Sequence, residues 1–89
     1  MEDTQKRRDR LYIISEILNI AKYGSLKTQI MYRANLSFSQ LNEYLNFLIK
    51  MNLLQINNED KKNTYVTTEK GEKYLKRYED LAGLLGSNS

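Results

Sequence analysis

The sequence predicts one small α+β domain that is mostly α. Apolar residues recur every three or four positions in four separate stretches, which is the spacing of one face of a helix. Between the third and fourth stretches the apolar residues alternate with polar ones, which is typical of strands. The chain has 89 residues, enough for a single domain, and we place that domain at residues 1–89 with its core at about 8–82.

The composition excludes several classes of function. The chain contains neither cysteine nor histidine, which removes zinc fingers, disulfide scaffolds and cysteine or histidine catalysis. No glycine-rich phosphate loop is present, and the adjacent carboxylates at 59–60 and 79–80 lie on predicted solvent-exposed segments. We therefore expect no enzyme, no metal, no cofactor and no small-molecule ligand.

The net charge of +3 is concentrated near the start of the chain. Residues 1–35 carry seven basic and four acidic side chains, including the cluster Lys6–Arg10. This cluster either attracts a polyanion without specificity or is an ordinary solvated terminus. No apolar run approaches the roughly 18 residues of a membrane-spanning helix, and the first residues lack the apolar core of a secretion signal. We expect a cytoplasmic protein with no membrane partner.

The first two helices are predicted from one apolar stripe each. The first is expected from about Thr4 to Tyr23, and Gly24 ends it. Ser25 is expected to cap a second helix of about two turns. The apolar positions of the two stripes are Leu11, Ile14, Ile17, Leu18 and Ala21 in the first, then Leu26, Ile30 and Ala34 in the second.

A third helix is predicted to start at Ser37. Its apolar stripe is Phe38, Leu41, Leu45 and Leu48, at steps of three and four residues. Ser37 and Gln40 have the spacing of a capping box, in which each side chain bonds the other residue's backbone amide. Asn52 is expected to end the helix in the left-handed conformation.

A β-hairpin and a fourth helix complete the predicted fold. The alternating residues Leu54, Ile56, Tyr65 and Thr67 flank a fully polar tip at 57–63, which predicts a hairpin. Thr68 is expected to cap a helix that runs to about Leu85. This order of elements predicts a winged helix-turn-helix with a two-stranded wing and a C-terminal helix, a fold in which the third helix can enter a major groove.

The stretch Lys27–Phe38, which reads Lys-Thr-Gln-Ile-Met-Tyr-Arg-Ala-Asn-Leu-Ser-Phe, resembles the signature Lys-Thr-x-Ile-Met-Tyr-x-Ala-Asn-Leu-Ser-Tyr of an archaeal winged helix family. Gln40–Leu48 and Thr68–Gly71 are also similar to that family, which includes ten-kilodalton dimeric chromatin proteins and related transcription regulators. The resemblance covers about residues 8–82. It implies a nucleoid-associated protein that binds duplex DNA. Asn52 stands where the family usually has glycine.

The predicted DNA contacts lie on the two central helices and the hairpin tip. Leu41, Tyr44, Leu45 and Leu48 are expected to face the core, which leaves a polar outer face on the third helix. Asparagine and glutamine can pair with adenine, whereas lysine and arginine contact phosphates. The candidates are Lys27, Arg33, Ser37, Ser39, Gln40, Asn42, Asn46, Lys50, Lys61 and Lys62. The alternative for each is a solvated side chain, a cap in the case of Gln40, or a favourable helix-dipole interaction in the case of Arg33.

The fourth helix predicts a homodimer. Tyr74, Tyr78, Leu81 and Leu85 follow steps of four, three and four residues, the spacing of a coiled-coil seam. The competing interpretation is that this face packs against the first helix of the same chain. Tyr32, Tyr44 and Tyr65 are predicted to pack in the core rather than to stack on bases.

The alternative function is a protein-interaction winged helix without a nucleic-acid role. Such a module would expose apolar anchors on the third helix, and Phe47 is the one candidate for such an anchor. A polar helix face flanked by lysine and arginine favours DNA instead.

Overall fold

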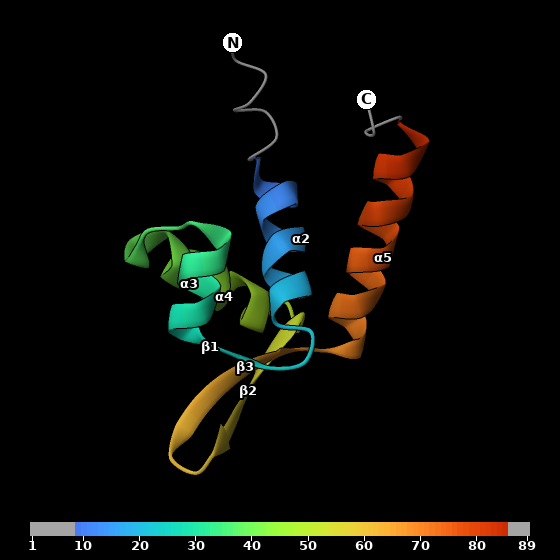
Figure 1. The fold of residues 1–89 in the computed structure, drawn as a ribbon. Helices are drawn as coiled ribbons and strands as arrows, with labels where there is room; N and C mark the ends of the chain where they lie inside the picture. The colour runs from blue at the N-terminus through green and yellow to red at the C-terminus, as the bar shows by residue number, and fades with distance from the viewer. Residues whose placement is uncertain (1–8, 86–89) are drawn as a thin grey trace.

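The computed structural model describes residues 9–85, which form helices and a small sheet (Figure 1). The elements in chain order are α2 (Arg10–Ile20), β1 (Ser25–Leu26), α3 (Lys27–Ala34), α4 (Phe38–Lys50), β2 (Leu54–Glu59), β3 (Lys62–Thr67) and α5 (Glu69–Leu84). This arrangement confirms the predicted winged helix-turn-helix. The expected start of the first helix at Thr4, and Lys6, Arg7 and Arg8 of the basic cluster, lie outside the described residues.

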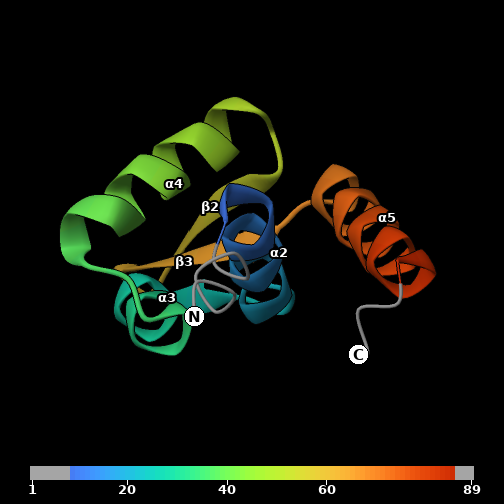
Figure 2. The ribbon, with the colours of Figure 1, turned by 90° about the horizontal axis from the view of Figure 1, so that it is seen from above.

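The core lies where α2 meets α3, α4 and the base of the sheet. Its fully buried side chains come from all four elements and include Ile17, Ile30, Leu41, Leu48 and Leu54. Seen from above, α2 stands between the α3–α4 pair on one side and α5 on the other (Figure 2). Most of the apolar residues predicted for the first three helices therefore meet at one place, but Leu11 and Phe38 are largely exposed.

The sheet has three antiparallel strands in the order β1-β3-β2, one more than predicted. The additional strand, β1, pairs Ser25 with Tyr65 and Leu26 with Thr64. Ser25 is therefore not the cap of the second helix, and its buried hydroxyl donates a hydrogen bond to the Ile20 carbonyl at 2.9 Å. The N-cap position is Leu26, whose backbone N–H donates to Gln29 Oε1 at 2.8 Å.

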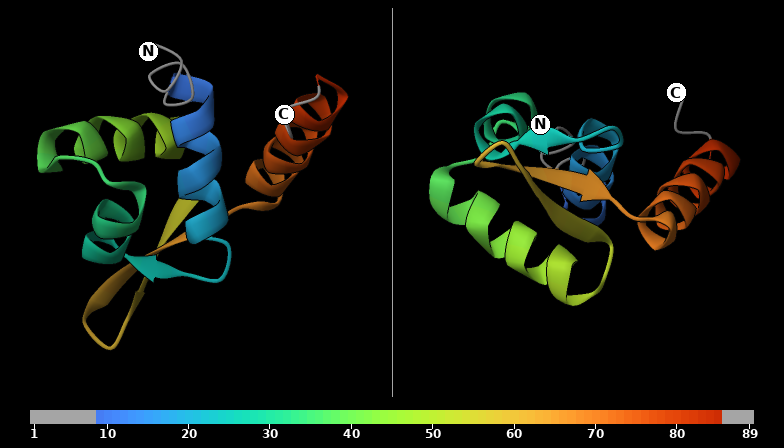
Figure 3. Two further views of the ribbon diagram at one scale, coloured as in Figure 1. Left: turned by 45° about the horizontal axis from the view of Figure 1, so that its top comes forward. Right: turned by 90° about the horizontal axis from the view of Figure 1, so that it is seen from below.

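The hairpin strands are longer than predicted, because most of the polar segment 57–63 is paired. Only Asp60 and Lys61 form the turn, with φ of 53° and 64°, as in the two-residue turns that match the twist of a hairpin. Asn58 Nδ2 donates to Asn63 Oδ1 at 2.6 Å across the strands. The hairpin consequently projects as a paired wing beyond the helices (Figure 3).

The sequence predicted the residue that ends α4 correctly but placed the end of the first helix too late. Asn52 has φ 66°, which confirms the predicted left-handed residue after α4, and Asn35 plays the same part after α3 with φ 57°. The first helix ends at Ile20, with Ala21 as its C-cap, and not at Tyr23. Gly24, with φ 97°, instead leads the chain into β1.

Thr68 and Gly71 join α5 to the rest of the domain. Thr68 Oγ1 accepts the Gly71 N–H at 3.0 Å and donates to the Asn52 carbonyl at 2.7 Å, so the predicted cap also holds the end of α4. A Cβ atom at Gly71 would overlap the Leu53 carbonyl oxygen and lie 2.7 Å from Thr67 Cγ2. Only glycine therefore allows this close approach of α5.

Candidate nucleic-acid interface

The first turn of α4 is fixed by a reciprocal cap. Ser37 Oγ accepts the Gln40 N–H at 3.1 Å, and Gln40 Oε1 accepts the Ser37 N–H at 3.0 Å. The predicted capping box is thus present. It uses the amide oxygen of Gln40 and leaves its NH₂ group as the part able to contact a base. Gln40 in this rotamer cannot pair bidentately with adenine, which requires both amide atoms.

The outer face of α4 is polar. Ser39, Glu43, Asn46 and Lys50 are exposed, in agreement with the predicted orientation of the helix. Asn42 differs from the prediction, because its side chain is half-buried. It lies one helical turn after Phe38, on the same flank of α4. Reading of a base by Asn42 therefore requires a different rotamer or a close approach of the helix.

Lys27 and Arg33 lie at the two ends of α3. The Lys27 ammonium lies 4.6 Å from the centre of the Phe38 ring, so it links the start of α3 to the start of α4. Arg33 is exposed in the last turn of α3, where a cation stabilises the helix dipole even without a ligand. Both cations border the turn that precedes α4.

The hairpin carries Lys61 and Lys62 on its exposed tip. Glu59 and Asp60 are exposed beside them, and Glu59 stands opposite Lys62 in the strand register. The tip therefore presents two cations and two carboxylates. Its attraction for phosphate depends on how these side chains are oriented at a DNA surface.

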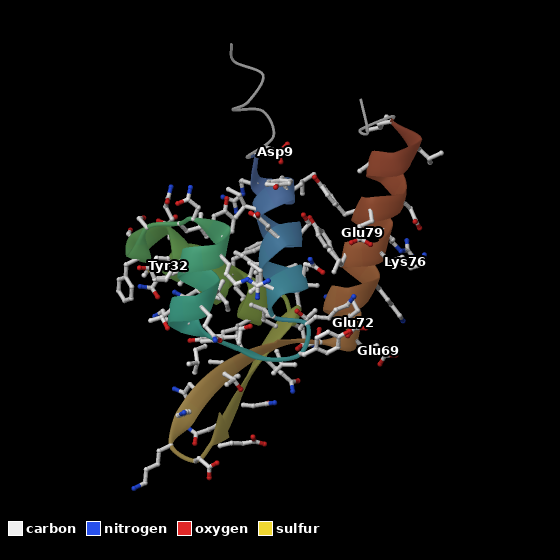
Figure 4. The ribbon with its side chains drawn as sticks, viewed as in Figure 1. Asp9, Tyr32, Glu69, Glu72, Lys76 and Glu79 are labelled. Carbon is white, nitrogen blue, oxygen red and sulfur yellow. The ribbon has the colours of Figure 1, made fainter. Side chains whose placement is uncertain are left out.

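Two aromatic residues on this side of the molecule are exposed, contrary to the sequence analysis. Phe38 belongs to the predicted apolar stripe but is 62% exposed, and Tyr32 is 85% exposed and points away from α2 (Figure 4). Tyr32 stands two residues from both Ile30 and Ala34, which places it on the opposite face of α3. The spacing within α3 was the signal that could have revealed it. Tyr44 and Tyr65 do pack against the core, as predicted.

The opposite flank of α4 faces α2 and is apolar. The Arg10 guanidinium lies 5.4 Å from the Tyr44 ring centre and 5.8 Å from that of Phe47, so this member of the basic cluster is held against α4. Phe47 is 37% exposed and borders a pocket of about 400 Å³. The pocket is lined by Leu11, Ile14, Phe47, Met51, Leu53, Lys70 and Tyr74.

The four predicted seam residues of α5 fall into two pairs. Tyr74 and Tyr78 are half-buried and face α2 of the same chain. Burial raises the pKa of each phenol, and the Asp9 carboxylate acts in the same direction. Leu81 and Leu85 are 54% and 76% exposed. The first pair therefore follows the competing interpretation of internal packing, and the second pair remains free to meet a partner.

Two further properties concern residues 9–85. In this part of the chain no group of three acidic side chains is arranged to hold a metal ion. None of the helices described there is long and apolar enough to cross a membrane.

The chain belongs to the winged helix-turn-helix family, whose model matches residues 7–85. An uncharacterized protein of Methanocaldococcus jannaschii is 34% identical over 82 residues, which cover 91% of this chain and 80% of that protein. A second uncharacterized protein of the same organism is 34% identical over 80 residues, or 89% of this chain and 36% of that protein.

A solved structure supports the same assignment. Sso10a-2, a DNA-binding protein from Sulfolobus solfataricus, superimposes with a TM-score of 0.80 at 25% sequence identity, over 90% of this chain and 84% of that one. The resemblance to an archaeal winged helix family, based on Lys27–Phe38, is thereby confirmed.

Proposed function

We propose that this protein binds duplex DNA, with α4 in the major groove and the β2–β3 hairpin against neighbouring phosphates, as an archaeal transcription regulator or chromatin-associated protein. The observation that carries the proposal is the polar outer face of α4, on which Ser39, Asn46 and Lys50 are exposed. Winged helix-turn-helix proteins present this helix to base edges. Family membership and the DNA-binding relative of known structure support the same function.

The proposed surface has a modest positive charge. Lys27, Arg33, Lys50, Lys61 and Lys62 contribute five cations, and Glu43, Glu59 and Asp60 contribute three carboxylates. Phosphate contacts supply most of the affinity of such an interface and make it salt-dependent. We therefore expect binding that weakens steeply with salt, with a log–log slope near −0.9 for each phosphate neutralised.

The base-reading and phosphate-contacting residues have separable roles. The exposed Ser39 and Asn46 would read bases, and Asn42 would do so in a different rotamer or with a close approach of the helix. Ser37 and Gln40 retain only the donor groups that the cap leaves free. Glu43 would repel phosphate and accept a hydrogen bond only from cytosine. The lysines and Arg33 would contribute affinity without reading sequence.

Titration of labelled duplex DNA at several salt concentrations tests the proposal. The doubly substituted Lys61→Ala, Lys62→Ala protein should bind all sequences more weakly and show a flatter salt slope, whereas Asn42→Ala should change sequence preference by about 1 to 3 kcal/mol. Lys73→Ala with Lys76→Ala is the matched control, because it removes the same charge from exposed positions on α5. Absence of binding at about 50 mM salt, over random and genomic duplexes, would rule out the proposal.

We also propose that a second copy of the chain is the protein partner. Leu11 borders both the pocket beside Phe47 and a second hollow lined by Leu81 and Leu85. An apolar surface therefore continues from the end of α4 to the end of α5, and the exposed leucines at one end are suited to cover such a surface on another copy. A dimer could place two α4 helices in successive major grooves, about 34 to 36 Å apart.

The same apolar surface is the observation in favour of the alternative function, a protein-interaction module that does not bind DNA. It lies on the α2 side of α4, whereas the outer face of α4 is polar. The two functions thus use different faces of the molecule, and the DNA titration separates them.

A further inference from the structure

Phe38 is a large apolar side chain that lies outside the core. It is the first residue of α4 and is 62% exposed, while Leu41, Leu45 and Leu48 are buried and anchor the helix. The Lys27 ammonium lies over the ring, 4.6 Å from its centre, a distance at which a cation is attracted to the ring electrons. This contact connects the ring to α3, and the ring is nevertheless largely exposed at the tip of α4.

Two polar groups beside Phe38 are held by the cap of α4. The Ser37 hydroxyl oxygen and the Gln40 amide oxygen both accept backbone hydrogen bonds within the cap. The phenyl ring is therefore the largest group in the first turn of α4 that takes no part in the cap. Residues at this end of the recognition helix are the ones that reach base edges.

We propose that the Phe38 ring contacts the C5-methyl groups of thymine in the major groove and so makes Phe38 a specificity-determining residue. This inference rests on the proposed binding of duplex DNA. The thymine methyl group is the one apolar feature on the major-groove edge of the bases, and phenylalanine is among the side chains that contact it. A phenyl ring carries no donor or acceptor, so it distinguishes thymine by apolar contact alone.

The test compares an alternating A·T duplex with the same duplex in which deoxyuridine replaces every thymine, which removes only the methyl groups. Binding of the full 89-residue chain is measured by fluorescence anisotropy at about 50 mM salt. One buried methyl group corresponds to roughly fourfold in affinity. The unsubstituted protein should therefore bind the uracil duplex at least about threefold more weakly.

Two variants locate the effect. Phe38→Ala should bind both duplexes equally. Phe47→Ala, which shortens the other partly exposed phenylalanine of α4 on the flank facing α2, should keep the preference for thymine. A preference that survives in Phe38→Ala would overturn the assignment, because a change in groove shape or another residue would then cause it.

Binding of the unsubstituted protein to the two duplexes distinguishes failure of this inference from failure of the proposed function. Equal binding of the two duplexes would overturn the role of Phe38 and leave the proposed DNA binding intact. No binding to either duplex would overturn the role of Phe38, and no binding to random and genomic duplexes as well would overturn the proposed DNA binding.

Discussion

α4 and α5 are both amphipathic helices, but they bury their leucine side chains to different extents. Leu41, Leu45 and Leu48, the apolar stripe of α4 after its first turn, are buried. In α5 only Gly71 and Leu75 are buried, both in its first half, and Leu81 and Leu85 are exposed. The leucine stripe of α4 is therefore covered within one chain, whereas the leucines in the second half of α5 remain largely exposed among residues 9–85.

Two glycines in α5 provide the sharpest test of this comparison. Gly71→Ala should lower the free energy of unfolding by about 3 kcal/mol, because the new methyl group would overlap the Leu53 carbonyl in a tightly packed contact. Gly83→Ala is the matched control, since nothing lies within 4 Å of a Cβ there. It should raise stability by about 1 kcal/mol through helix propensity. Urea unfolding of the three proteins measures both values, and equal effects at the two positions would show that α5 packs uniformly along its length.

The exposed leucines of α5 test the proposed dimer. Leu81→Glu with Leu85→Glu should weaken self-association by about 2 kcal/mol or more, because burial of each leucine contributes roughly that amount. Leu84→Glu is the control, since Leu84 is highly exposed but lies off the predicted seam. Sedimentation equilibrium at tens of micromolar provides the measurement. A monomeric unsubstituted protein, or unchanged mass in the double variant, would show that these leucines form no seam.

Tyr74 tests the packed half of α5 with a smaller effect. Its hydroxyl oxygen is buried without a hydrogen-bond partner in the described part of the chain, and such a group destabilises the folded state. Tyr74→Phe should therefore raise the free energy of unfolding by about 1 kcal/mol at neutral pH. A loss of stability in thermal or urea unfolding would mean that the hydroxyl has a partner in solution.

The pH dependence sharpens this result. Burial raises the pKa of Tyr74 above its ordinary value of 10.0, so the unfolded chain releases this proton at lower pH than the folded chain does. Titration of Tyr74 therefore leaves the free energy of unfolding unchanged below pH 10 and lowers it as the pH rises above 10. Unsubstituted protein should thus lose stability more steeply than Tyr74→Phe above pH 10, and parallel curves would contradict the raised pKa.

Local signals in the sequence predicted most of the fold. The capping box of Ser37 and Gln40, the left-handed Asn52 and the Thr68 cap each depend on a few adjacent residues, and all three are present. Strand β1 could not be predicted in this way. It has two residues, too few for an alternating pattern, and its partner strand follows about 40 positions later.

The candidate site was less predictable, because it depends on which flank of a helix the neighbouring elements cover. Phe38 has the spacing of a core residue, yet it lies beyond the end of the core at the tip of α4. Asn42 has the spacing of a surface residue but is half-buried. Lys61 and Lys62 lie at the hairpin tip, as predicted, but the paired strands extend to Glu59 and Lys62, which is further than the polar sequence 57–63 indicated.

The most direct test of the proposed DNA-binding face is a map of backbone amide signals by NMR as a duplex is added. Binding through the helix-turn-helix and wing predicts the largest shifts at residues 37–50 and 59–62, with little change over 69–84. Shifts confined to the apolar pocket outside these ranges, around Leu11, Ile14 and Met51, or spread mainly over α5, would contradict it.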